Sequence, residues 1–197
     1  MKKTTSIIFS LIFFYSLAFA QKTKNQIEEA QVKQTCISFL KWYKRNSDNL
    51  KTSPVIKGFN PDTIKKDSIL KVDMNAVEIY LSNFKAGGYV SAVFLNHLRS
   101  IYKSVSDTLT IHQVKDYFGP IPSLESDIVL GFGKEEILDN IKKAKIKHFL
   151  RIYNKALISL RLSYTTEIVF TLTREKKHWE IDYIGFNGDN KYNIGSQ

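Results

Sequence analysis

The chain contains little cysteine, the residue whose disulfide bonds stabilise many small domains. Of its 197 residues only Cys36 is a cysteine. A single cysteine cannot form an internal disulfide, so the fold must depend on its core and its hydrogen bonds. Cys36 lies on the apolar stripe of a predicted helix, and free cysteine is among the most buried residue types. We therefore expect a buried, inert thiol rather than one that reacts or pairs between chains.

The sequence also lacks the short motifs that would impose a mechanism. It contains no HExxH, CxxC or GxSxG pattern and no phosphate-binding glycine loop. The stretch GFGKEE at 131–136 resembles a nucleotide-binding loop only faintly, because the remaining glycine and the strand–helix context are missing. The four histidines are His97, His112, His148 and His178. They lie far apart, without the spacing of metal ligands, so we predict neither a metal site nor a cofactor.

The apolar run at the start of the chain is too short for a membrane span. Residues 1–20 begin with a basic pair, continue with IIFSLIFFYSLAFA and end in a small-x-small triplet. A spanning helix needs roughly 20 apolar residues, whereas this pattern is typical of a secretory signal peptide. We predict cleavage after Ala20 and export to the periplasm or the medium, with no membrane anchor retained. Gln21 stands where the usual lipid attachment requires cysteine.

Acidic residues are scarce relative to basic ones. The net charge is +10, and removal of Lys2 and Lys3 with the signal peptide leaves +8. Such a balance favours encounter with anionic partners. The basic residues are scattered, however, and the densest patches, TREKKH and DNIKKAKIKH, look like solvated turns or faces. For an exported chain this distribution predicts no nucleic-acid partner.

The length favours a single domain, which we place at 21–186. Within it, apolar residues recur at helical steps over 26–45, over 74–86 and over 91–105. Asp73 and Ser91 are suitable N-caps for the second and third helices. A pair of glycines ends the second helix, so these two helices should pack as an antiparallel pair.

The last third of the chain alternates as strands do. Strands are predicted over 147–154 and 158–164 and in a hairpin over 167–186. The segment 135–145 fits either a helical turn or the edge of the sheet. Helices followed by consecutive antiparallel strands indicate an α+β fold, with N-terminal helices packed on one face of a curved antiparallel sheet.

Two further segments look irregular. Residues 46–67 are polar, with prolines and a glycine, and predict a long loop with at most a short strand. Long loops are often functional, so this one is a candidate lid. The polar, glycine-bearing stretch 187–197 predicts a flexible tail.

Three segments carry a resemblance to a known superfamily. They are YLSNFKAGGYVSAVFLNHLRSIY at 80–102, IPSLESDIVL at 121–130 and TLTREKKHWEIDYIGF at 171–186. With them the chain resembles exported bacterial proteins of unestablished function in the cystatin-like, nuclear-transport-factor-like α+β superfamily. The resemblance covers roughly 26–186 and implies a cone, in which a bent sheet wraps the helices and a pocket opens at the wide end. Members of the superfamily include isomerases, dehydratases, ligand binders, toxin-immunity proteins and dimerisation modules, so the fold leaves function open.

The resemblance directs attention to polar residues that would face such a cone. Enzymes of this superfamily place an Asp, His or Tyr in the pocket as general acid or base, and the candidates here are Asp127 and His97. The alternative is that the tyrosine rings fill the core, His97 faces water and Asp127 caps a turn. Asp182 is expected to face solvent or the rim. The predicted ligand-binding set is Tyr43, Tyr80, His97, Asp127, Trp179 and Tyr183.

The lack of catalytic motifs favours a binding role over catalysis. The chain is 13% aromatic, and an apolar cavity with a few polar groups is the usual form of a small-molecule site. The ligand would be a small apolar molecule or a protein partner, including a second copy bound through the sheet. The competing hypotheses are a filled cone that binds nothing, an isomerase or hydro-lyase using Asp127 or His97, and a toxin-immunity protein.

Overall fold

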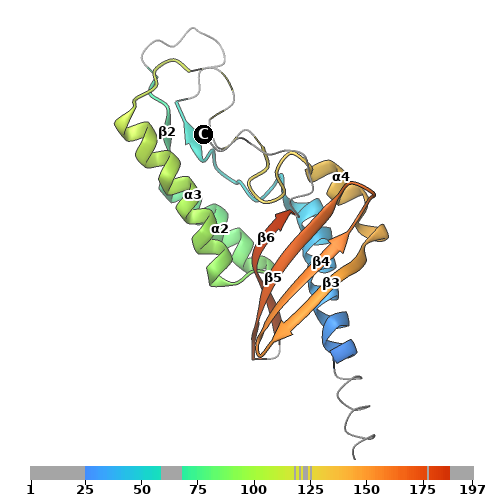
Figure 1. Ribbon diagram of the computed structural model, residues 1–197. Coiled ribbons are helices and arrows are strands. Elements are labelled where there is room, and N and C mark those ends of the chain that lie inside the picture. Colours follow the sequence, from blue (N-terminus) through green and yellow to red (C-terminus); the bar gives the residue numbers. More distant parts are fainter. Residues whose placement is uncertain are drawn as a thin grey trace, which may run out of the picture.

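The computed structural model covers most of the predicted domain (Figure 1). The predicted signal peptide, the tail 187–197 and residues 59–67 of the candidate lid lie outside the described residues. The described residues are 25–58, 68–117, 119, 121, 124, 126–176 and 178–186.

A long helix opens the described chain and confirms the first predicted helix. It covers residues 25–46. Its apolar stripe includes Val32, Cys36, Phe39 and Tyr43, all of which are buried. Burial raises the pKa of the Cys36 thiol well above its ordinary value. The prediction of a buried cysteine is confirmed.

The second and third helices form the predicted antiparallel pair (Figure 1). Helix α2 spans Met74–Gly87 and α3 spans Ala92–Ile111. The Asp73 and Ser91 side chains accept hydrogen bonds from backbone N–H groups of the first turns, as N-caps do. Gly88 ends α2 at a φ of 72°, a left-handed conformation that glycine adopts without a Cβ penalty.

A short ribbon joins the first helix to α2. Strand β1, Ile56–Lys57, pairs antiparallel with β2, Lys71–Val72. Just before β2, the Leu70 N–H donates to the Val114 carbonyl oxygen at 2.9 Å. This bond holds the ribbon against the segment that follows α3.

The C-terminal third is one antiparallel sheet of four strands in chain order. Before it, α4 spans Lys134–Asp139 and a 3-10 turn spans Ile141–Lys143, so the segment left undecided by its sequence is mostly helical. In the sheet, Leu160, Phe170 and Ile181 are fully buried, which confirms the predicted period of two. The strands are β3, Lys145–Ile152; β4, Lys155–Arg161; β5, Glu167–Glu175; and β6, His178–Phe186.

The first two strands begin and end earlier than their alternation predicts. The strand predicted to reach Tyr164 ends at Arg161, and Tyr164 is 98% exposed. The cause is local, because the Ser163 hydroxyl accepts hydrogen bonds from the N–H groups of Thr165 and Thr166. Such a serine turn competes with the sheet for these backbone groups.

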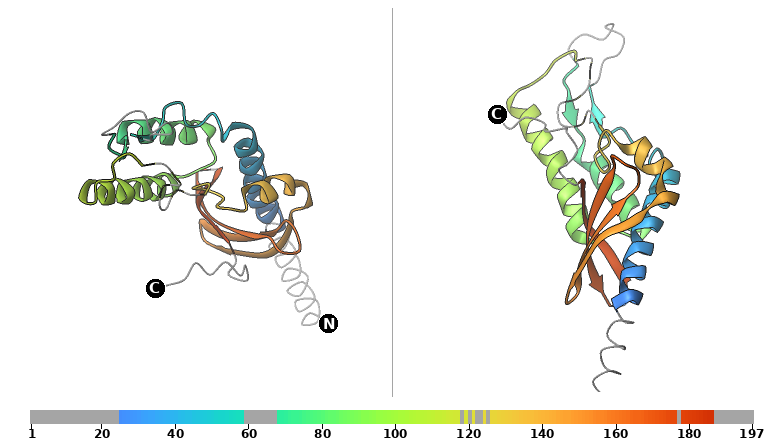
Figure 2. Two further views of the ribbon diagram at one scale, coloured as in Figure 1. Left: turned by 90° about the horizontal axis from the view of Figure 1, so that it is seen from above. Right: turned by 45° about the vertical axis from the view of Figure 1, so that its right-hand side comes forward.

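The fold is α+β, and the sheet does not close into a barrel (Figure 2). Seen from above, the sheet is curved, and the first helix and α4 lie in its concave side. The α2–α3 pair lies beyond the edge formed by β6 (Figures 1 and 2). Residues 89–91 make that junction, because Ser91 N donates to Ile181 O and Ile181 N donates to Tyr89 O.

Asp182 corrects one expectation from the sequence. It was expected at the solvent or rim but is only 7% exposed. A register shift after Thr171 interrupts the pairing of β5 with β6 beside it. The Asp182 carboxylate accepts hydrogen bonds from the Ser91 hydroxyl at 2.7 Å, from Lys155 Nζ at 3.0 Å and from the Thr173 hydroxyl. It therefore ties the N-terminus of α3 to the sheet.

Candidate ligand-binding groove

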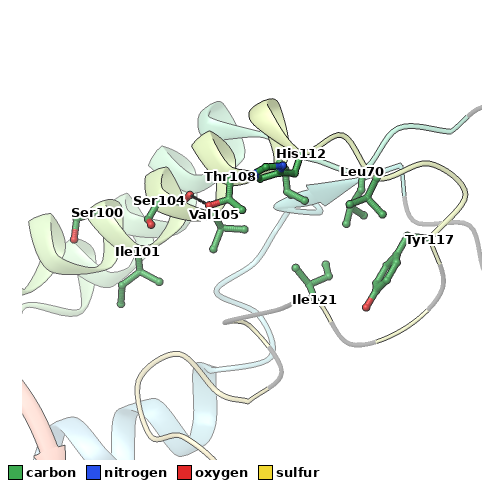
Figure 3. Close-up of a pocket in the computed structure, with 11 residues that line it drawn as sticks. Leu70, Ser100, Ile101, Ser104, Val105, Thr108, His112, Tyr117 and Ile121 are labelled. Carbon is green, nitrogen blue, oxygen red and sulfur yellow. Dashed lines mark hydrogen bonds between the residues drawn. The ribbon is translucent and has the colours of Figure 1, made fainter. Parts of the chain in front are cut away.

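A groove of about 460 Å³ lies along α3 (Figure 3). Ligand pockets commonly measure roughly 300–1,000 Å³ and combine an apolar wall with a few polar groups. The apolar lining of this groove is Leu70, Ile101, Val105, Leu109, Val114 and Ile121. Polar side chains line the rest: Ser100, Ser104, Thr108, His112 and Tyr117.

The apolar wall of the groove follows from the spacing of apolar residues on α3. Ile101, Val105 and Leu109 recur every four residues, so they share one face of α3. The bond between Leu70 and Val114 holds a second wall opposite that face. The helix pair lies beyond β6, so the sheet does not cover this part of α3 (Figure 2).

A second cavity of about 190 Å³ adjoins the groove. Ile121 lines both spaces. Tyr102 of α3, Lys51 and Ser126 supply polar groups to the smaller cavity, whose other side chains are apolar: Val55, Ile56, Leu124 and Ile128. The larger space is mostly apolar, whereas the smaller one combines apolar and polar groups, and we call it the polar cavity.

Tyr102 lines this polar cavity and carries a buried hydroxyl. The residue is 1% exposed, and its hydroxyl has no hydrogen-bond partner among the described residues. Burial and, to a smaller extent, the charge of Asp127 raise the pKa of Tyr102 to about 12. At neutral pH the group is a protonated donor, and leaving such a donor buried without a partner is costly.

Lys51 brings the positive charge to the same cavity. Its Nζ lies 5.6 Å from the centroid of the buried Tyr80 ring, within the range of a cation–π contact. Desolvation lowers the pKa of the Lys51 ammonium; nearby Asp127 counteracts this, and nearby Lys134 adds to it.

Asp127 lies close to this cavity but is already engaged. Its carboxylate accepts from the Tyr43 hydroxyl at 2.8 and 2.9 Å and from the N–H groups of Val129 and Leu130 at 3.0 and 2.9 Å. Lys134 Nζ adds an ion pair at 3.5 Å. The turn cap considered for Asp127 is therefore present, with Tyr43 attached to it.

The interior between the first helix and the helix pair is filled with aromatic rings. Phe39 stacks on Tyr43 at 5.8 Å, and Tyr43 stacks on Phe84 at 5.9 Å between ring centroids. Tyr80 meets Phe84 and Tyr102 edge to face at 5.1 and 6.0 Å. Tyr43 and Tyr80 thus have rings in the core, and burial raises the pKa of both hydroxyls.

The remaining predicted site residues lie elsewhere. His97 is exposed on α3, where its ring meets that of the half-exposed Tyr183 edge to face at 5.7 Å. Trp179 is buried in β6 with the Arg174 guanidinium 5.9 Å from its ring centroid. The structure thus brings Tyr43 and Asp127 together. None of the six predicted residues, all of which the structure describes, lines the larger groove.

Sequence reasoning missed the residues that matter most for this site. The apolar stripe of α3 was recognised as far as Val105, but it reads equally well as core. Tyr102 lies within the segment that carries the superfamily resemblance. Nothing in that sequence distinguishes a buried hydroxyl without a hydrogen-bond partner from one that has a partner. Lys51 lies in a polar loop, and only the tertiary fold brings it to Tyr80.

Within the described ranges, no group of three or more His, Cys, Asp and Glu side chains is placed to hold a metal ion. No helix among the described residues is both long and apolar enough to cross a membrane.

Comparison with known proteins found no match: no family model, no curated protein and no solved structure is similar to this chain. The groove and the polar cavity therefore have to be interpreted from their own chemistry.

Proposed function

We propose that this is an exported, non-catalytic binding protein whose groove along α3 takes a small apolar ligand. The observation that carries the proposal is the groove itself, about 460 Å³ with an apolar wall on α3. Ligand binding removes such apolar surface from water, and about 25 cal/mol is gained for each Å² buried. The proposal of export is supported by the signal-like pattern of residues 1–20.

The geometry favours binding over the isomerase or hydro-lyase alternative. A general base needs an accessible position beside the substrate. The Asp127 side chain is 14% exposed and already accepts from Tyr43 and two backbone N–H groups. His97 is exposed on α3 and packs on Tyr183. Neither candidate lines the groove.

The test is titration with N-phenyl-1-naphthylamine, a neutral apolar probe that fluoresces when it leaves water. Two threonines of α3 offer a matched pair of variants, since both are exposed and each hydroxyl donates to the carbonyl four residues earlier. Thr108 lines the groove and Thr110 does not. Thr108→Trp should fill the groove and weaken probe binding at least about tenfold, which corresponds to about 1.4 kcal/mol. Thr110→Trp should bind like the wild type.

Two results would contradict the proposal. One is an unchanged fluorescence of the probe on addition of the folded wild-type protein. The other is equal binding by the Thr108→Trp and Thr110→Trp variants, which would place the probe outside the groove.

A further inference from the structure

We propose that the ligand is amphipathic, with an aliphatic part in the groove along α3 and a singly charged carboxylate in the adjoining polar cavity. Lys51 and the Tyr102 hydroxyl would bind the carboxylate. This inference rests on the proposed function and names the chemical class of its ligand.

The first argument is the Tyr102 hydroxyl. Tyr102 lines the cavity, and its hydroxyl is buried with no hydrogen-bond partner among the described residues. Buried polar groups are almost always paired, so an unpaired one calls for an explanation. Burial and the nearby Asp127 charge keep the phenol protonated, so it is available to donate to an acceptor that enters the cavity. A carboxylate oxygen is such an acceptor.

The second argument is the charge around the cavity. Lys51 lines it; the side chain as a whole is exposed, while its ammonium lies 5.6 Å from the Tyr80 ring centroid, and desolvation there lowers the pKa of Lys51. A desolvated cation gains from an anionic partner. Lys134 lies nearby but pairs with both Asp127 and Asp48, which leaves Lys51 as the charged side chain that lines the cavity. The balance favours a single negative charge on the ligand and disfavours a doubly charged phosphate.

The third argument is that the two spaces adjoin. Ile121 lines both, and Tyr102 follows Ile101 directly on α3 while their side chains line different spaces. Figure 3 shows Ile121 beside the groove, facing α3. An apolar space thus lies next to one that carries polar groups. A fatty acid has this same division into tail and head.

The experiment compares decanoate with decan-1-ol as competitors of N-phenyl-1-naphthylamine, at concentrations below the micelle threshold of decanoate. The two have the same chain length and differ in the head group. The wild type should bind decanoate at least about tenfold more tightly, since a hydrogen bond to a charged group commonly contributes that much. Tyr102→Phe and Lys51→Gln should each lose about tenfold for decanoate and bind decan-1-ol unchanged.

A matched control separates local charge from net charge. Lys147 is exposed on β3 and does not line either cavity. Lys147→Gln removes the same charge as Lys51→Gln and should leave decanoate affinity unaltered. Raising the salt concentration should weaken decanoate binding in the wild type and in Lys147→Gln more than in Lys51→Gln.

The outcomes distinguish the two proposals. Equal affinities for decanoate and decan-1-ol in the wild type, or undiminished decanoate binding by folded Tyr102→Phe, would overturn the carboxylate site. Binding of the neutral probe would still support the groove in that case. Failure of the wild type to bind any of the three compounds would overturn both proposals.

Discussion

The two ends of the molecule differ in the pairing of two deeply buried polar side chains and in their cavities. On the concave side of the sheet, Glu28 is only 3% exposed, yet it is paired with both Arg151 and Arg174. Beside α3, the Tyr102 hydroxyl is equally buried and has no partner among the described residues. The sheet end is not fully satisfied, since Trp179 Nε1 in β6 is also buried without a partner among the described residues, but both described cavities lie at the end that holds α3.

This difference is instructive about where function lies. Unpaired polar groups and open cavities reduce stability, and proteins tolerate such defects chiefly where activity requires them. We therefore propose that the sheet with the first helix is the structural support and that the region around α3 holds the ligand. Asp182 lies at the junction and ties one to the other through Ser91.

Removal of Glu28 should have the largest effect on stability. Glu28→Ala leaves Arg151 and Arg174 without their shared carboxylate, and breaking a buried ion pair in this way costs about 3 kcal/mol. Urea unfolding would measure the loss. Glu29→Ala, one position along the same helix, should cost less than about 0.5 kcal/mol. Equal losses in the two variants would remove the basis for treating this end as the support.

The Asp182→Asn variant should show the next largest loss of stability. It replaces a buried acceptor that serves Ser91, Thr173 and Lys155, and should cost about 2 kcal/mol. Asp107→Asn is the control, because Asp107 pairs with Lys103 on the exposed side of α3 and such pairs contribute little. A cost similar to that of the control would show that the junction does not depend on Asp182.

The same carboxylate predicts a dependence on pH. Burial raises the pKa of Asp182, but the hydrogen bonds from Ser91, Thr173 and Lys155 outweigh burial and hold that pKa below its usual value. Its contribution is therefore present above the unfolded pKa of about 3.9 and is lost as pH falls through the folded pKa. The stability difference between wild type and Asp182→Asn should narrow in acid, as urea midpoints at a series of pH values would show. A constant difference would contradict this assignment.

The smallest effects should differ in sign between two tyrosines. Tyr43→Phe removes a hydroxyl that donates to Asp127 and should cost about 1.5 kcal/mol. Tyr102→Phe removes a hydroxyl without a partner and should stabilise the ligand-free protein by about 1 kcal/mol. Thermal unfolding would reveal both shifts. A loss of stability in Tyr102→Phe would mean that its hydroxyl is satisfied, and would weaken the contrast between the two ends.

The parts of the fold that depend on neighbouring residues were predictable. The N-caps at Asp73 and Ser91, the glycine that ends α2 and the period of two in β5 and β6 all follow from side chains within a few positions. The end of β4 was less predictable from the sequence. A turn at Ser163 ends the strand, although the alternation of apolar and polar residues continues to Tyr164.

The site was much less predictable from the sequence. Tyr43 and Asp127 were both named, but their separation of 84 residues conceals that they bond to each other. Glu28 lies in the first predicted helix, and its partners Arg151 and Arg174 lie more than 120 positions away. Such pairings depend on how helices and sheet pack, which no local pattern records.

By itself the sequence determined where helices and strands occur, which of their faces are apolar and that the class is α+β, because these properties arise from short-range periodicity and capping. Only the tertiary structure decided that the aromatic rings fill the interior, that the helix pair lies beyond β6, and that Lys51 and Tyr102 share a cavity. These are consequences of packing between distant segments, where shape and the pairing of buried polar groups select one arrangement.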